Sequence, residues 1–315
     1  MSAESSTRQG APHEPPPRQS LPRQLLLASR PLSWINTAFP FAAAYLLSTG
    51  RVDAALIIGT VFFLVPYNLA MYGVNDVFDY ASDVANPRKG GVHGALLAPR
   101  LHRATLVTAV ALCLPFVVAL VVLGPPASWL VLAVSLFAVA AYSVPGLRFK
   151  EIPVLDSLTS STHFVSPAVY GIVLAGAPFG PVAIIVLLAF FLWGVASHAF
   201  GAVQDVRPDR EAGIGSIATA LGAAATVRLA LACWALAGLV LLLLVPLGYG
   251  WPGALAALLV VPYLVLAWPY RSVSDEDSAS ATGGWRHFLW VNYAVGFLAT
   301  MLLIFSAVDA RSLFG

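Results

Sequence analysis

Two clusters of acidic side chains, one in residues 75–83 and one in residues 205–213, stand out in a chain with few charged residues. Their oxygen ligands are Asn75, Asp76, Asp79 and Asp83 in the first cluster and Asp205 and Asp209 in the second. On a helix, the spacing within the first cluster brings its polar groups to one face. Carboxylates packed together repel unless a cation neutralises them, and oxygen ligands select Mg²⁺, which keeps waters and bridges to phosphates. The clusters therefore predict a Mg²⁺-bound diphosphate.

The composition indicates which elements must position these clusters. Apolar residues make up 59% of the 315 positions and charged residues 10%, compared with about 25% charged in an ordinary soluble domain. These values predict an all-α, polytopic membrane protein, and apolar stretches of about 20 residues predict nine transmembrane helices. The predicted spans are residues 31–48, 53–74, 102–123, 126–144, 157–175, 180–202, 223–247, 252–270 and 286–307.

The distribution of lysine and arginine predicts the orientation of this bundle. With a cytoplasmic N-terminus, fifteen of the seventeen cations lie on the inner side, and only Arg51 and Arg311 lie on the outer side. This asymmetry is typical of multi-pass proteins of the cell membrane. Residues 1–24 are predicted to form a disordered cytoplasmic tail and residues 25–315 a single integral membrane domain. Both acid clusters then lie at cytoplasmic ends of spans, where they can share one site.

A third cytoplasmic segment, residues 142–150, lies between the two acid clusters in the sequence. It carries Arg148 and Lys150, and Arg88 and Lys89 follow the first cluster. Cations at these positions are suited to bind phosphate. They also have an ordinary explanation, because the cytoplasmic ends of membrane helices carry Lys and Arg to hold topology.

Several polar residues have two interpretations. Asn68 precedes the first cluster and either joins two helices by a hydrogen bond or lines a substrate pocket. His198 lies two helical turns before Asp205, where it lines the cavity or packs as a hydrogen-bonded histidine, and we favour packing. Arg207 and Arg210 offer the second cluster ordinary ion pairs in place of a metal.

The pattern N-D-x-x-D-x-x-x-D ends the second predicted helix, and D-x-x-x-D-x-x-x-G follows the sixth. Together with Tyr-Ser-x-Pro-x-Leu-Arg-x-Lys over residues 142–150, they resemble the motifs of the UbiA superfamily of intramembrane prenyltransferases. The resemblance covers residues 24–310 and departs from the family pattern at Gly146, where many members have a second proline. It implies a helical bundle around a lipid-open cavity, capped by cytoplasmic motifs at which Mg²⁺ binds an isoprenoid diphosphate.

The resemblance also implies roles for individual residues. The implied metal ligands are Asp76, Asp79 and Asp83 for one Mg²⁺ and Asp205 and Asp209 for another, with Asn75 beside the diphosphate between them. The residues implied in binding the diphosphate are Asn68, Arg88, Lys89, Arg148 and Lys150. Ionisation of the donor leaves an allylic cation that alkylates an acceptor alkene where water is excluded, and Tyr142 would orient the phosphate or shield the cation.

Within the superfamily, residues 29–40, 66–74 and 86–92 look like those of actinobacterial lycopene elongases, which join five-carbon units from dimethylallyl diphosphate to lycopene. The expected partners are an isoprenoid diphosphate, a lipophilic lycopene-like acceptor and the lipid bilayer, with no nucleic acid. Transfer of a longer prenyl chain to an aromatic or quinone precursor is the alternative. A cation-coupled secondary transporter is less favoured, because alternating access places its acids near the midplane of the membrane.

Overall fold

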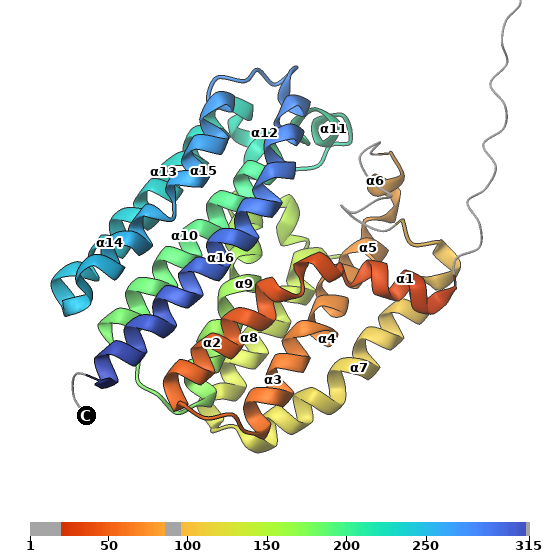
Figure 1. Cartoon of the computed structure of the whole chain (residues 1–315). Coiled ribbons are helices and arrows are strands. Elements are labelled where there is room, and N and C mark those ends of the chain that lie inside the picture. The colour runs from red at the N-terminus through yellow and green to blue at the C-terminus, as the bar shows by residue number, and fades with distance from the viewer. Residues whose placement is uncertain (1–19, 86–95, 313–315) are drawn as a thin grey trace, which may run out of the picture.

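The computed structural model describes residues 20–85 and 96–312, and the regular elements within these ranges are all helices (Figure 1). The predicted all-α class is therefore confirmed. The α-helices are α1 (Leu21–Ala28), α2 (Ile35–Thr49), α3 (Ala54–Leu64), α4 (Pro66–Asn68), α5 (Val74–Phe78), α6 (Tyr80–Ala85), α7 (His102–Leu123), α8 (Pro126–Ser143), α9 (Leu155–Leu174), α10 (Pro181–Val203), α11 (Val206–Glu211), α12 (Ile217–Leu221), α13 (Ala223–Leu242), α14 (Gly250–Leu258), α15 (Val261–Ala267) and α16 (Ala281–Ser312). Turns of 3₁₀ helix cover Pro31–Ser33, Pro99–Leu101, Phe149–Glu151, Trp268–Tyr270 and Ser278–Ser280, and π-helical turns cover Leu69–Gly73 and Val245–Tyr249.

The predicted count of nine spans is not confirmed. Among the described residues, seven helical segments are long and apolar enough to cross a membrane, and they are Ala54–Phe78, Pro99–Leu123, Pro126–Ser143, Pro181–Val203, Ala223–Leu242, Val245–Tyr270 and Ser278–Ser306. The other two predicted spans correspond to α2 and α9. The first of these has only 15 residues, and the second begins with a run of serine and threonine.

The polar helix α9 lies inside the bundle, packed against α2, α8 and α10. Several of its buried polar side chains find partners in the protein rather than in lipid. The hydroxyl of Ser161, for example, donates a hydrogen bond to the carbonyl of Phe191 in α10 over 2.7 Å. A helix of this composition is stable at membrane depth because neighbouring helices satisfy its polar groups.

Two aromatic clusters fill the bundle on either side of α9 and α10. In the first, the ring of Phe41 in α2 lies 5.2 Å from that of Phe63 and 6.0 Å from that of Tyr170. In the second, the ring of Trp234 in α13 lies 5.4 Å from that of Tyr263 in α15. All five residues are buried, so the two clusters anchor the helices that carry the acid residues.

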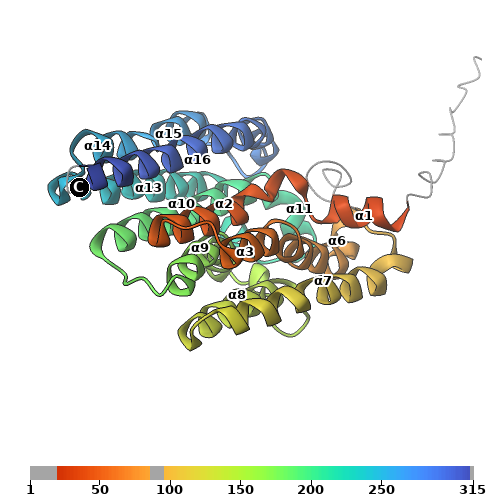
Figure 2. The ribbon, with the colours of Figure 1, turned by 60° about the horizontal axis from the view of Figure 1, so that its bottom comes forward.

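The bundle brings the two acid-bearing segments to the same end (Figures 1 and 2). Helices α5, α6, α11 and α12 lie at that end together with α1, whereas the C-terminus and the turn between α7 and α8 lie at the opposite end. The first helix begins at Leu21, inside the stretch 1–24 predicted as a tail. Pro22 stands in its first turn, where a missing N–H costs no helical hydrogen bond.

Gly171 is a position where the packing of α9 on α2 leaves no room for a side chain. An added Cβ there would lie 2.7 Å from the carbonyl oxygen of Phe41, whereas one at Gly296 in α16 would meet open space. Both glycines are inside α-helices, so alanine gains similar helix propensity at each. We expect Gly171→Ala to lower the free energy of unfolding by about 1–3 kcal/mol and Gly296→Ala not to lower it. Thermal unfolding in detergent measures both, and equal losses would contradict this packing.

Candidate active site

The first acid cluster lies where the segment Ala54–Phe78 ends and α6 begins. Helical hydrogen bonding continues through the cluster, because the backbone N–H of Asp79 donates to the Asn75 carbonyl over 2.9 Å and that of Asp83 to the Asp79 carbonyl over 2.8 Å. The predicted helical register of these residues is therefore kept. Asp76 is 1% exposed, and Asp79 and Asp83 are each 6% exposed. Such buried carboxylates require compensating positive charge or hydrogen bonds.

Cationic side chains from two other segments meet this cluster. The guanidinium of Arg30 lies 2.9 Å from a carboxylate oxygen of Asp76. Lys150 forms an ion pair with Asp79, and Arg148 lies 3.6 Å from the same carboxylate. The structure thus places both predicted cations of the 142–150 segment on the first acid cluster.

Unusual backbone geometry aims two of these cations at the cluster. Among the described residues, the non-glycine positions with positive φ are Arg30 (50°), Arg148 (43°) and Val154 (74°). A left-handed conformation costs such residues about 1–2 kcal/mol each, so the surrounding structure must hold it. Gly146 has a φ of +93°, which a proline, whose ring fixes φ at about −65°, does not adopt. The glycine therefore shapes the turn that presents Arg148 and Lys150.

The second acid cluster lies at the end of α10, with Asp205 preceding α11 and Asp209 inside it. Both aspartates are half-buried. The neighbouring arginines pair with other acids, because Arg207 lies 2.9 Å from Glu211 and Arg210 lies 2.5 Å from Asp275.

Asp275 joins the second cluster to the loop before α16. Its other carboxylate oxygen accepts a hydrogen bond from the backbone N–H of Ala223 over 2.6 Å. This hydrogen bond and the contact with Arg210 lower the pKa of Asp275. The loop is therefore fixed both to α11 and to the start of α13.

Carboxylates of both acid clusters affect the pKa of Lys150. Burial lowers the pKa of Lys150 to about 8, and the carboxylates of Glu151, Asp209 and Asp76 oppose that decrease. Asp76 belongs to the first cluster and Asp209 to the second, so one ammonium group senses both. A hydrogen bond of 2.9 Å from Ser143 to the side-chain oxygen of Asn75 joins the end of α8 to the first cluster.

The remaining predicted residues differ in their placement. Arg88 and Lys89 lie outside the described residues. Asn68 is fully buried, and its amide donates to the hydroxyl of Thr37 over 2.7 Å and to the carbonyl of Phe63 over 2.8 Å. These contacts agree with the interpretation that Asn68 joins two helices by hydrogen bonds. Tyr142 lies one residue before Ser143 at the end of α8, with its ring beside those of two histidines.

Arg30 is a site residue that the sequence reasoning missed. It was counted only as one of many inner cations, yet it contacts Asp76 and lies 4.3 Å above the ring of Tyr72. Its position directly before Pro31 and the first predicted span was the available signal, because a residue before proline is forced out of the helical conformation. Asp156, buried at the start of α9, was also missed.

The donor atoms at the two clusters fit Mg²⁺ by chemistry, since they are carboxylate oxygens. Within the described part of the chain, however, no three His, Cys, Asp or Glu side chains are placed to hold one ion together. Mg²⁺ is commonly bound through one or two carboxylates, with waters and substrate phosphates as its other ligands. The arrangement therefore fits an ion completed by a diphosphate rather than a closed protein cage.

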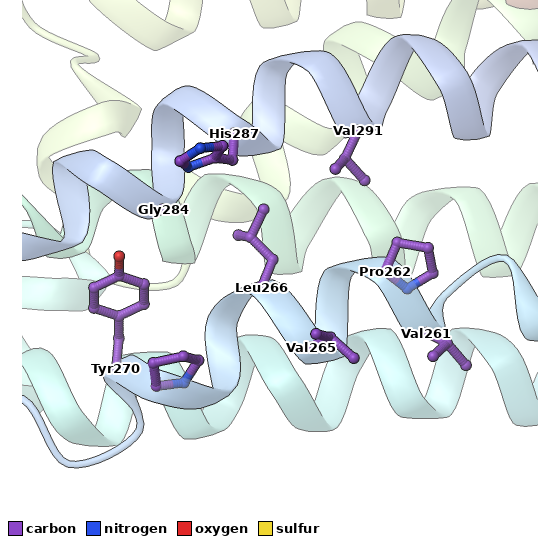
Figure 3. A pocket seen from close by; sticks show the side chains of 9 residues that line it. Val261, Pro262, Val265, Leu266, Tyr270, Gly284, His287 and Val291 are labelled. Atoms are coloured by element: carbon purple, nitrogen blue, oxygen red, sulfur yellow. The ribbon is translucent and has the colours of Figure 1, made fainter.

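An apolar groove of about 530 Å³ lies away from this site, between α15 and α16 (Figure 3). Val261, Leu266 and Val291 line it, and Tyr270 and His287 are its polar side chains. None of its lining residues belongs to either acid cluster. We assign it no part in the chemistry expected of the acid clusters.

The buried ion pair of Arg30 and Asp76 should be coupled energetically. The exposed pair of Arg207 and Glu211 has the same separation, 2.9 Å, and serves as the matched control. Unfolding of single and double variants, Arg30→Met with Asp76→Asn and Arg207→Met with Glu211→Gln, should give a coupling of about 0.5–3 kcal/mol for the buried pair. The exposed pair should give less than about 1 kcal/mol. Additive effects at Arg30 and Asp76 would contradict the contact.

Comparison with known sequences identifies the family. Residues 37–292 match the profile of the UbiA prenyltransferase family. The chain is 53% identical to the C(50) beta-cyclic carotenoids biosynthesis protein LbtBC of Dietzia sp. (strain CQ4), over 94% of this chain and 67% of that protein. It is 48% identical to the lycopene elongase/hydratase of Corynebacterium glutamicum, over 90% of this chain and 96% of that protein.

Solved structures show the same fold. The UbiA homolog from Archaeoglobus fulgidus bound to DMAPP and Mg²⁺ matches with a TM-score of 0.63 and 18% identity, over 86% of this chain and 98% of that one. The apo UbiA homolog from Aeropyrum pernix K1 matches with a TM-score of 0.65 and 19% identity, over 93% and 99%. The chain therefore belongs to the UbiA prenyltransferase family and is a multi-pass membrane prenyltransferase.

Proposed function

We propose that this prenyltransferase moves a five-carbon prenyl group from dimethylallyl diphosphate to lycopene in a Mg²⁺-dependent reaction. The observation that carries the proposal is that both acid-bearing segments lie at one end of the bundle, where Lys150 forms an ion pair with Asp79 of the first cluster. The acceptor is proposed from relatives at 48% identity that are named lycopene elongase/hydratase. The donor is the ligand of the Archaeoglobus homolog, which was solved with DMAPP and Mg²⁺.

The aspartates of the two clusters are proposed to hold the metal. One or two carboxylates from among Asp76, Asp79 and Asp83 would hold one Mg²⁺, and Asp205 and Asp209 would hold a second, with diphosphate oxygens and waters as the other ligands. When bound, Mg²⁺ neutralises the phosphate oxygens and favours departure of the diphosphate. Asn75, fixed by Ser143, would hydrogen-bond the diphosphate between the clusters.

The basic side chains on the first cluster supply the remaining positive charge. Lys150 and Arg148 contact Asp79, and Arg30 contacts Asp76. We propose that Lys150 and Arg148 bind the diphosphate oxygens when the donor arrives, and that Arg88 and Lys89 act in the same way. Negative charge grows on these oxygens as the carbon–oxygen bond breaks, so fixed cations stabilise the transition state more than the bound donor.

The interior of the bundle would protect the allylic cation. We propose that the ring of Tyr142, the residue before the Ser143 that bonds to Asn75, lies beside the prenyl group of the donor. The negative face of an aromatic ring stabilises a nearby cation, and a water-poor interior prevents premature quenching. The acceptor alkene would then attack the cation, which leaves a tertiary cation on the acceptor.

The proposed location is the cell membrane, with the N-terminus and the active-site loops in the cytoplasm. With the nine spans predicted from the sequence, fifteen of the seventeen lysines and arginines lie on the inner side in this orientation, as the positive-inside rule requires. Residues 25–315 are proposed to act as one integral membrane domain, to which α1 is joined.

Purified protein supplied with dimethylallyl diphosphate and lycopene in detergent tests the function. We expect products heavier than lycopene by one or two five-carbon units, and their loss on chelation of divalent cations. Asp76→Ala and Asp205→Ala should each lower turnover by at least about 100-fold while the protein remains folded. Products formed only with an aromatic acceptor and a longer donor would contradict the proposal.

Lys150→Met should weaken donor binding, because it removes the ammonium group that is paired with Asp79 and is proposed to bind the diphosphate. Arg228→Met is the matched control, since Arg228 is an exposed cation at the same end that bonds to the carbonyl of Arg271. We expect the KM for the donor to rise about tenfold or more in Lys150→Met and to stay unchanged in Arg228→Met. An equal KM in both variants would reduce Lys150 to a topology anchor.

A further inference from the structure

A second polar cluster lies inside the bundle beside the acid-bearing end, and the transfer step does not use most of it. Its members are Tyr142 in α8, Asp156 and His163 in α9, and His198 in α10. Asp156 is 0% exposed and His163 is 3% exposed. Polar groups buried so deeply in a membrane protein are commonly functional.

Asp156 orients His198. A carboxylate oxygen of Asp156 lies 3.5 Å from Nε2 of His198. The backbone N–H groups of Ser157 and Ile217 each donate to Asp156 over 2.7 Å, so the carboxylate is fixed between α9 and α12. A carboxylate beside one ring nitrogen holds the proton there and leaves the other nitrogen, Nδ1, as a proton acceptor.

The hydrogen bonding of Nδ1 distinguishes His198 from His287, another helical histidine of the chain. His287 in α16 is exposed, and its Nδ1 lies 2.8 Å from the carbonyl of Gly283, four residues earlier. Within the described ranges, the Nδ1 of His198 has no such hydrogen bond to the protein, although Gly194 stands at the equivalent position. The backbone therefore leaves this nitrogen available for a ligand.

The surrounding groups suit a small polar ligand. The Nε2 of His163 is buried without a hydrogen-bond partner in the described part of the chain. The ring of Tyr142 lies 5.2 Å from that of His163 and 6.4 Å from that of His198, edge-on to both. A buried water needs two to four polar partners, and these three side chains supply that number.

The cluster is next to the proposed site of transfer. Tyr142 precedes Ser143, whose hydroxyl donates to Asn75 of the first acid cluster. His198 lies in α10, which ends just before Asp205, and it precedes Asp205 by seven residues. The polar cluster thus lies one layer deeper in the bundle than the groups proposed to bind the diphosphate.

We propose that His198, positioned by Asp156, is the general base that adds water to the cation left on the acceptor. This inference rests on the proposed function and names the residue that ends its reaction. The water oxygen forms a bond to the tertiary carbon while one of its O–H bonds breaks. That proton passes to Nδ1 of His198, and the product is a tertiary alcohol. The histidine later returns the proton to solvent, so transfer consumes one donor, one acceptor and one water.

The test measures the fate of the acceptor cation in oxygen-labelled water. Purified protein is given dimethylallyl diphosphate and lycopene, and donor consumption, product masses and label are recorded. We expect the wild type to give elongated products that carry a labelled hydroxyl group. In His198→Gln the ratio of hydrated to unsaturated product should fall about tenfold or more, while donor consumption persists, because the cation then loses a proton instead.

Three further variants separate chemistry from folding. His287→Gln is the control and should keep the wild-type product ratio. Asp156→Asn should shift the product ratio in the same direction as His198→Gln. If Asp156 had only a structural role, its substitution would lower thermal stability and leave the product ratio unchanged. His198→Asn provides a second substitution if the glutamine variant does not fold.

Several results would overturn the inference. An unchanged ratio in folded His198→Gln or His198→Asn would remove the histidine from the step, and loss of donor consumption in step with product would make it a binding residue. Elongated products without labelled oxygen in the wild type would contradict water addition but leave prenyl transfer standing. Absence of any elongated product from the wild type would contradict the proposed function and the inference together.

Discussion

Three aspartates of the first acid cluster are almost completely withdrawn from water, and the rest of the active-site end is arranged around the charge that they bury. Removing a carboxylate from water costs several kcal/mol unless another charge or hydrogen bonds compensate it. Arg30 arrives from the turn before the first long helix, and Lys150 and Arg148 arrive from the turn after α8. Two of these cations occupy left-handed backbone conformations. Local backbone strain is thus part of the arrangement that brings positive charge to the first acid cluster.

The same need for charge balance explains how the site can bind a metal ion together with an anionic diphosphate. Carboxylates that are already paired with basic side chains form a nearly balanced set of charges. A metal ion and a diphosphate can enter such a set together, because the ion joins the acids and the phosphate joins the bases. Coulomb interactions are stronger in a site of low dielectric than in water, so the exchange favours a ligand that carries both signs of charge. This is the physical basis for proposing a metal-bound diphosphate rather than either component alone.

The sequence predicted the features that depend on local spacing and composition. The helical register of residues 75–83, the all-helical class and the placement of both acid clusters at one end agree with the structure. Features set by tertiary packing were harder to predict. The polar face of α9 and the short α2 fall outside a simple hydropathy pattern, which is why the count of nine spans is not confirmed. The role of Asn68 depended on Thr37, a partner 31 residues away.

Arg30 and Asp156 show why part of the site escaped the sequence. A guanidinium before the first span looks like any topology anchor until the fold brings it to Asp76. Asp156 looks like an acidic residue in the first turn of a helix until its contacts with Ile217 and His198 are seen. Both are long-range contacts, so the local sequence does not show which side chain each of them meets. Gly146 is a different case, since the sequence showed only its departure from the family pattern and the positive φ of the turn was found in the structure.

The central claim is that the two acid clusters form one diphosphate site. Binding of inorganic diphosphate with Mg²⁺ to the wild type, Asp79→Asn, Asp209→Asn and the double variant tests it most directly. If the clusters share the ligand, the two substitutions should interact by about 0.5–3 kcal/mol in binding free energy. Effects that add to within about 0.5 kcal/mol, or an Asp209→Asn variant that binds like the wild type, would contradict a shared site.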